Sequence, residues 1–174
     1  MKKKRQIQGF TLLEMLVTIS LLALIATTGT QLLTTILKNS SKARIGQLVK
    51  QEGNFAMMAM ERTIRNAKSI DISSIPCSSE MTKLALVNYN GDDLAFEFIN
   101  IGASGYIASE GASIKPITSD AVEVSSGNFE CDSGLDNSPA MIKVDFTLKQ
   151  ANSSLRPEET VSIPFHQTIS LRNY

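Results

Sequence analysis

The residue that most directly indicates chemistry is an acidic one at the edge of an apolar segment. Glu14 lies shortly after Gly9 and directly before Met15–Leu37, a run of 23 residues without a charge. An ionisable group in such a helix is costly and usually has a partner. A cut before Phe10 would create one, because the new α-ammonium would lie about one helical turn from Glu14. We therefore expect Glu14 to neutralise an N-terminal amine, its own or that of a neighbouring chain.

The apolar run is long enough to cross a membrane. A helix of 23 residues would extend about 35 Å, and the core of a bilayer is about 30 Å thick. The basic residues Lys2–Arg5 precede it and predict that the leader stays in the cytoplasm, while everything after residue 38 is exported. The expected topology is a single pass through the cytoplasmic (inner) membrane, with the N-terminus inside.

Two simpler interpretations of this segment remain open. A secretory signal peptide also has a basic start and an apolar core, but that core is usually about 7–15 residues long, and Ala26–Thr28 is a poor cleavage site. A permanent single-span anchor, holding an exported binding domain, explains length and topology equally well. The permanent anchor leaves Glu14 unexplained.

The residues Gly9-Phe10-Thr11-Leu12-Leu13-Glu14, preceded by a short basic leader, resemble the class III signal of type IV prepilins and pseudopilins. In that family a membrane aspartyl peptidase cuts after the glycine and methylates the new N-terminal residue. The glutamate pairs with the N-terminus of an adjacent subunit during assembly. The resemblance implies that Gly9 is the cleavage residue, Phe10 the methylated N-terminus and Glu14 the assembly carboxylate.

The same resemblance implies partners and a location. The partners are the prepilin peptidase and methyltransferase, other pilin or pseudopilin subunits, an inner-membrane assembly platform and membrane lipid. After assembly the chain would be a structural subunit of a type IV pilus or of a filament like that of type II secretion. The stretch Met60–Ala67 is similar to the end of the long helix in PilW-like and J-type minor pilins.

The spacing of apolar residues predicts that the helix continues beyond the membrane. No proline interrupts residues 10–75, so we expect a helix as far as Ser69 or Ile70. Gly46 and Gly53 favour a bend or partial melting, and the methionines Met57, Met58 and Met60 are expected to fill core gaps rather than bind a soft metal. The apolar residues expected on one face, covering a sheet, are Ile45, Leu48, Val49, Phe55, Ala56, Ala59, Met60 and Ala67.

The pattern after Pro76 changes to short alternating runs that are typical of strands. Asn90-Gly91 predicts a hairpin turn between the first two, and Pro164 predicts an edge or a bulge in the last. The expected strands are Lys83–Tyr89, Leu94–Ile99, Ala121–Val124, Met141–Lys149 and Thr160–Leu171. The expected fold class is α+β, with a long helix on an antiparallel sheet, similar to the pilin fold.

Four sequence regions follow from these assignments. They are a basic leader (1–9), a transmembrane and assembly helix (10–37), an amphipathic helix extension (38–70) and an extracytoplasmic β-rich domain (71–174). Removal of the leader leaves 13 basic against 17 acidic residues, so the body is mildly acidic and has no basic stripe for nucleic acid.

The remaining candidates for chemistry lie in the β-rich region. Cys77 and Cys131 lie in the same compartment, so they form either a disulfide, favoured by an oxidising compartment, or two unrelated buried thiols. Loops are expected at Gly102–Ser113 and Glu130–Pro139.

In the second of these loops, Asp132, Asp136 and Asn137 could supply oxygen ligands to calcium, as happens in a comparable loop of some pseudopilins, but their spacing does not match an EF-hand. Turn chemistry explains them better, and no cofactor is expected.

Catalysis is not indicated. His166 is the only histidine and lies in an expected strand, where a solvent-facing position is the simplest interpretation. No phosphate-binding glycine loop, paired metal-ligand motif or nucleophile elbow is present in the sequence. We therefore expect a protein that is not an enzyme.

Overall fold

The computed structural model describes residues 9–73, 77–102, 104–111, 113–132, 139–151 and 160–171. Its contacts divide the chain into two units, Met1–Ser41 and Lys42–Tyr174. A single helix, α1 (Leu12–Arg65), supplies the described helical part of the first unit and the first element of the second.

The part of α1 in the first unit is a bare apolar helix. All of its described side chains are exposed, and by length and composition α1 can cross a membrane, with a mean hydropathy of 1.9 in its most apolar window. Its hydroxyl groups donate to carbonyls of the preceding turn, as in Ser20 to Val17 at 2.8 Å and Thr27 to Ala23 at 3.0 Å. Such bonds satisfy the hydroxyl donors without water, as a helix in lipid requires.

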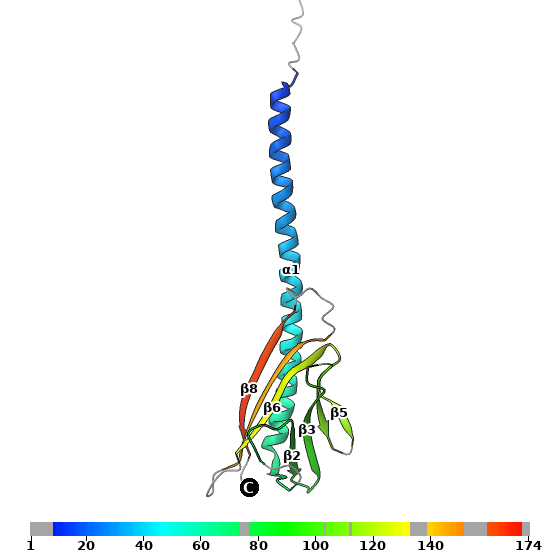
Figure 1. Ribbon diagram of the computed structural model, residues 1–174, viewed down its shortest axis with the longest axis vertical. Helices are drawn as coiled ribbons and strands as arrows, with labels where there is room; N and C mark the ends of the chain where they lie inside the picture. The colour runs from blue at the N-terminus through cyan, green and yellow to red at the C-terminus, as the bar shows by residue number, and fades with distance from the viewer. Residues whose placement is uncertain are drawn as a thin grey trace, which may run out of the picture. The chain divides into compact units, whose positions relative to one another are not determined.

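The second unit contains two antiparallel sheets (Figure 1). The five-stranded sheet has the order β1 (Ala67–Ile70), β2 (Lys83–Asn88), β3 (Asp93–Ile99), β4 (Tyr106–Glu110) and β5 (Ile114–Pro116). The three-stranded sheet has the order β6 (Val122–Asp132), β7 (Met141–Gln150) and β8 (Ser162–Ser170). The predicted α+β architecture, a long helix with antiparallel sheets, is confirmed.

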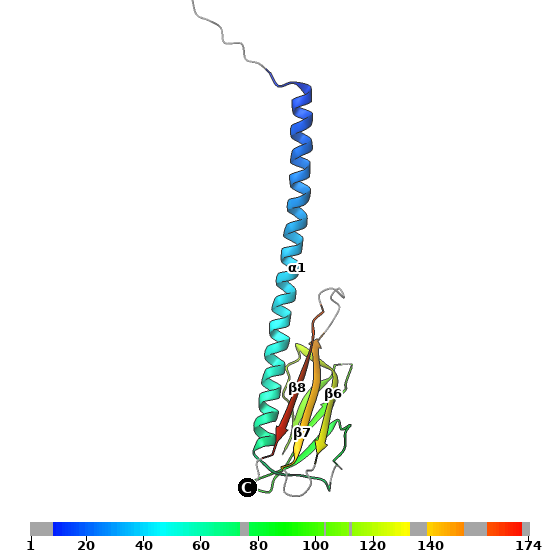
Figure 2. The ribbon, with the colours of Figure 1, turned by 90° about the vertical axis from the view of Figure 1, so that its left-hand side faces the viewer.

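The core of this unit lies between the helix and the sheets. The alternation predicted for β7 is confirmed, because Ile142, Val144, Phe146 and Leu148 are at most 1% exposed. From the helix, Val49, Ala56, Met60 and Ile64 join the same apolar cluster. Figure 2 shows the second half of α1 running alongside β8.

Close packing between α1 and β8 depends on a glycine. A Cβ at Gly53 would lie 2.0 Å from Cζ of Phe165, so only glycine lets the ring approach the helix this closely. Phe165 in turn stacks on Phe146, with ring centroids 5.1 Å apart.

The predicted helix differs from the observed one in two respects. It ends at Arg65 rather than at Ser69 or Ile70, because Ala67–Ile70 pairs with β2 as a strand. It is not interrupted at Gly46 or Gly53. Hydrogen bonding of Ala67–Ile70 to β2 stabilises these four residues more than continuation of the helix would.

The predicted apolar face is also partly wrong. Leu48 and Phe55 are 38% and 57% exposed, so they do not contribute to the core as expected. Met58, expected to fill a core gap with the other two methionines, is 61% exposed. Met57 and Met60 do fill it. The observed buried stripe is rotated toward Gly53 and Ile64 because the sheet approaches the helix on the glycine side.

The five predicted strands are found with small changes at most of their ends, but the first predicted loop is wrong in part. Residues 106–110 and 114–116 form β4 and β5 inside and just beyond Gly102–Ser113. The strand expected at Ala121–Val124 runs on to Asp132, so Glu130–Asp132 belongs to β6 rather than to the second loop. Pro164 lies in β8, which pairs only with β7 and is therefore an edge strand, as predicted.

Candidate functional site

The start of α1 is shaped by a threonine cap. The backbone N–H of Glu14 donates to Oγ1 of Thr11 at 3.3 Å, and the N–H of Met15 donates to the Thr11 carbonyl at 3.2 Å. Thr11 is therefore the N-cap, and Glu14 occupies the third helical position, the spacing of a capping box. Sequence reasoning missed Thr11, although its spacing of three from Glu14 was a usable signal.

The bond between Gly9 and Phe10 lies just before this cap. Both residues are outside the helix and exposed, and the Phe10 side chain is 75% exposed. Nothing lies within 4 Å of a Cβ built on Gly9, and its φ is not in the left-handed region. The fold of this chain therefore does not require glycine at position 9, so a requirement for glycine must come from another molecule.

Glu14 lies in the first turn of α1 with its side chain exposed. No described residue forms an ion pair with it. Gly9, Phe10 and Glu14 lie within the first six described residues. The peptide bond between Gly9 and Phe10 is exposed to solvent, and the capped helix that follows it carries the Glu14 carboxylate, which has no ion-pair partner among the described residues.

Comparison with known proteins identifies this same region. Residues 4–30 match the family model described as the prokaryotic N-terminal methylation motif. No curated protein and no solved structure matches the chain. The motif supports a type IV pilin-like protein, a class in which processing by a prepilin peptidase precedes assembly.

Cys77 and Cys131 form a disulfide with a Cα–Cα distance of 5.2 Å. Hydrogen bonds continue this link between the segment before β2 and strand β6. The N–H of Cys131 donates to the Ser78 carbonyl at 3.0 Å, and Met81 and Phe129 exchange two backbone bonds. The disulfide therefore closes a short ladder that joins the approach to β2 with the second sheet.

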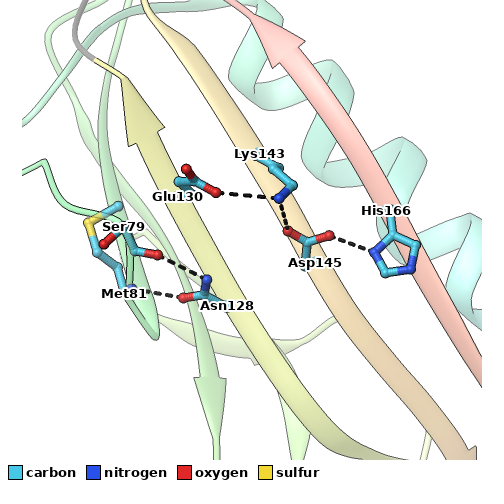
Figure 3. Close-up of polar contacts among 7 residues, drawn as sticks. All are labelled: Ser79, Met81, Asn128, Glu130, Lys143, Asp145 and His166. Atoms are coloured by element: carbon cyan, nitrogen blue, oxygen red, sulfur yellow. Dashed lines mark hydrogen bonds and ion pairs between the residues drawn. The ribbon is translucent and has the colours of Figure 1, made fainter.

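Asn128 strengthens this ladder (Figure 3). Its Nδ2 donates to the Ser79 carbonyl at 3.1 Å, and its Oδ1 accepts from the N–H of Met81 at 3.0 Å. The side chain thus satisfies two backbone groups of the segment that precedes β2. No motif around Asn128 marked this role in the sequence.

A row of charged side chains crosses the outer face of β6, β7 and β8, with α1 behind the sheet (Figure 3). Lys143 lies 3.4 Å from both Glu130 and Asp145, and Asp145 lies 2.6 Å from Nδ1 of His166. The hydrogen bond that Lys143 donates to Glu130, followed by the charge of Asp145, raises the pKa of Lys143 above its ordinary value. His166 is exposed on a strand, as predicted, and within the described residues it contacts a carboxylate rather than a nucleophile.

The weak calcium candidate lies mostly outside the described residues. Asp132 is the last residue of β6, whereas Asp136 and Asn137 are not described. Among the residues that the structure describes, no group of three or more His, Cys, Asp or Glu side chains could hold a metal ion.

Proposed function

We propose that this chain is a minor pilin or pseudopilin, a structural subunit of a type IV pilus or of a type II secretion-like filament. It is inserted in the inner membrane with its N-terminus in the cytoplasm, cut between Gly9 and Phe10, and methylated at Phe10. It then enters the filament through α1, with Glu14 compensating the amine of a neighbouring subunit. Its role is assembly, and we propose that it has no catalytic activity of its own.

The observation that carries this proposal is the methylation motif over residues 4–30 at the start of an apolar helix. The solvent exposure of the Gly9–Phe10 bond supports the proposal, because a peptidase must reach that bond. Exposure of every described side chain in residues 9–44 supports it as well, because a helix this apolar needs lipid or other helices around it. The choice of a minor subunit rests on the similarity of Met60–Ala67 to PilW-like and J-type minor pilins.

The mature N-terminus tests the proposal directly. Intact-mass and N-terminal analysis of the native protein should find a chain that begins at methylated Phe10. A mature protein that keeps Met1–Gly9 would favour the alternative, an exported binding domain on a permanent anchor. A start near Gly29 would favour a cleaved signal peptide.

A Glu14→Ala variant tests the assembly role separately. It should still be cut after Gly9, because the bond stays open, but it should enter filaments poorly, since the neighbouring amine would lack a counter-charge. Immunoblots of sheared filaments measure incorporation. The matched control is Glu61→Ala, which removes a partly exposed carboxylate elsewhere on α1 that pairs with Arg65 at 2.8 Å. Normal incorporation of Glu14→Ala would remove the proposed role.

A further inference from the structure

Residues 38–51 of α1, which follow the apolar segment, carry positive charge only. No acidic residue occurs between Glu14 and Glu52. Lys42, Arg44 and Lys50 are exposed, and none of them forms an ion pair with a described residue. These cations therefore lack a protein partner within the described part of the chain.

The positions of these cations around the helix restrict what could bind them. Successive residues of an α-helix are rotated by about 100°, so Lys42 and Arg44 project about 200° apart, from nearly opposite sides. Lys50 projects at about 80° from Lys42. A single partner protein covers one side of a helix, whereas a layer of lipid headgroups surrounds it. The arrangement therefore fits a surrounding layer better than a flat protein surface.

The covalent chain keeps two of these cations near the membrane surface. Lys42 and Arg44 follow Leu37, the last residue of the uncharged run, by five and seven residues. Each helical residue advances about 1.5 Å, and each headgroup layer adds about 5–8 Å to the hydrocarbon core. Long Lys and Arg side chains reach several ångströms back toward the interface.

We propose that Lys42 and Arg44 form a binding site for anionic phospholipid headgroups at the extracytoplasmic surface of the membrane. The proposal rests on the membrane-inserted precursor of the proposed function. The lysine contributes a compact charge, and the guanidinium can bind two oxygens of one phosphate. With Lys2–Arg5 at the other end of the span, both ends of the precursor would hold anionic lipid and fix its depth in the bilayer.

The test compares lipids around the full-length protein. The chain is reconstituted into phosphatidylcholine vesicles, and spin-labelled phosphatidylglycerol or phosphatidylcholine is added as the probe. The relative association constant of the two probes is then obtained from the motionally restricted component of the electron paramagnetic resonance spectrum. A Lys42→Gln/Arg44→Gln double variant should lower the preference for phosphatidylglycerol by about fivefold for each charge at low salt. The difference in selectivity between wild type and the double variant should shrink at about 0.5 M salt, because salt at this concentration screens the attraction between the side chains and the headgroups.

A matched control removes two charges elsewhere. Arg62 and Lys115 are exposed and lie beyond the juxtamembrane segment, so Arg62→Gln/Lys115→Gln should keep the wild-type preference. Equal selectivity in wild type and the Lys42/Arg44 variant overturns the proposal, as does an equal loss in the control. Selectivity that is unchanged while filament incorporation falls also overturns it, because these cations would then bind another subunit.

The outcome is separable from that of the proposed function. Lipid selectivity is measured on the uncut chain, whereas the filament proposal depends on a methylated Phe10. A permanent anchor could show the lipid preference without processing, and a processed subunit could lack it.

Discussion

Gly53 is the position where a single atom has the largest predictable effect on the fold. An added Cβ would lie 2.0 Å from the Phe165 ring, and that ring stacks on Phe146 and cannot easily move. Overpacking of this kind costs about 1–3 kcal/mol, against a gain of up to about 1 kcal/mol from helix propensity. We expect Gly53→Ala to lower the free energy of unfolding by about 1–2 kcal/mol, measured by urea denaturation.

Gly46 provides the matched control on the same helix. A Cβ there would meet only Cγ1 of Val161, at 3.8 Å, which is an ordinary contact. Gly46→Ala should therefore raise the free energy of unfolding by about 0.5–1 kcal/mol. Equal effects of the two substitutions would show that helix propensity, rather than the Phe165 contact, decides the outcome.

The residue-level chemistry could be predicted only where it depends on local sequence. Gly9, Phe10 and Glu14 are adjacent in the chain, so their spacing was sufficient to locate the candidate site. The contact between Gly53 and Phe165 joins residues far apart in the sequence. Its glycine was interpreted as a weak point of the helix, because a sequence does not show which ring will approach it.

Among the elements, strands with regular alternation were predictable and strands with close backbone contacts were not. Strand β7 shows every second residue apolar, and its bounds were nearly correct. In β6 a polar run that contains Gly127 conceals the strand in the sequence. Glycine is needed at this position because a Cβ there would lie 2.5 Å from the Phe98 ring. Gly105, just before β4, is required for a similar reason, since a Cβ would lie 2.7 Å from the Val124 carbonyl oxygen.

The link between Cys77 and Cys131 should contribute measurably to stability. It closes a loop with a sequence separation of 54, and loops of this length are stabilised by about 2–4 kcal/mol when cross-linked. We expect Cys77→Ala/Cys131→Ala to lower the free energy of unfolding by that amount. Reductant should destabilise the wild type similarly and leave the variant unchanged, and an effect of reductant on the variant would argue against this assignment.

A charge cluster on the five-stranded sheet should make stability depend on pH. Lys83 on β2 forms ion pairs with Glu110 and, at 3.6 Å, with Glu97. The hydrogen bond to Glu110 raises the pKa of Lys83 above its ordinary value, although partial burial opposes the shift. Because the folded pKa is the higher one, the stabilisation is complete below the unfolded pKa of about 10.4 and is lost as the pH rises through the folded pKa.

The corresponding measurement is urea denaturation between about pH 9 and 11.5, a range that brackets the ordinary pKa of lysine. Wild type should lose more stability over this range than Lys83→Met, which lacks the titrating group. Lys115→Met serves as the control, because Lys115 on β5 forms no ion pair with a described residue. Parallel pH profiles for wild type and Lys83→Met would contradict the assignment.

For the whole molecule, the second unit should fold without the first. The described residues 9–44 are exposed throughout, and the buried cluster begins at Val49. We expect a chain that starts at Lys42 to be soluble without detergent and to unfold cooperatively. Its free energy of unfolding should agree with that of the full chain within about 0.5 kcal/mol. Aggregation, or loss of the cooperative transition in circular dichroism, would contradict this.

The disulfide also determines how the chain would respond to mechanical force. If the second unit is pulled by its two ends, tension passes along the helix and β1 to Cys77, across the sulfur bridge to Cys131, and onward to β7 and β8. Strands β2–β5 and most of β6 lie outside this load path. The sequence separation of 54 between the cysteines corresponds to about 180 Å of extended chain. That length of chain cannot be extended while the disulfide is intact. A subunit unfolded by force would therefore lengthen by less than its number of residues suggests.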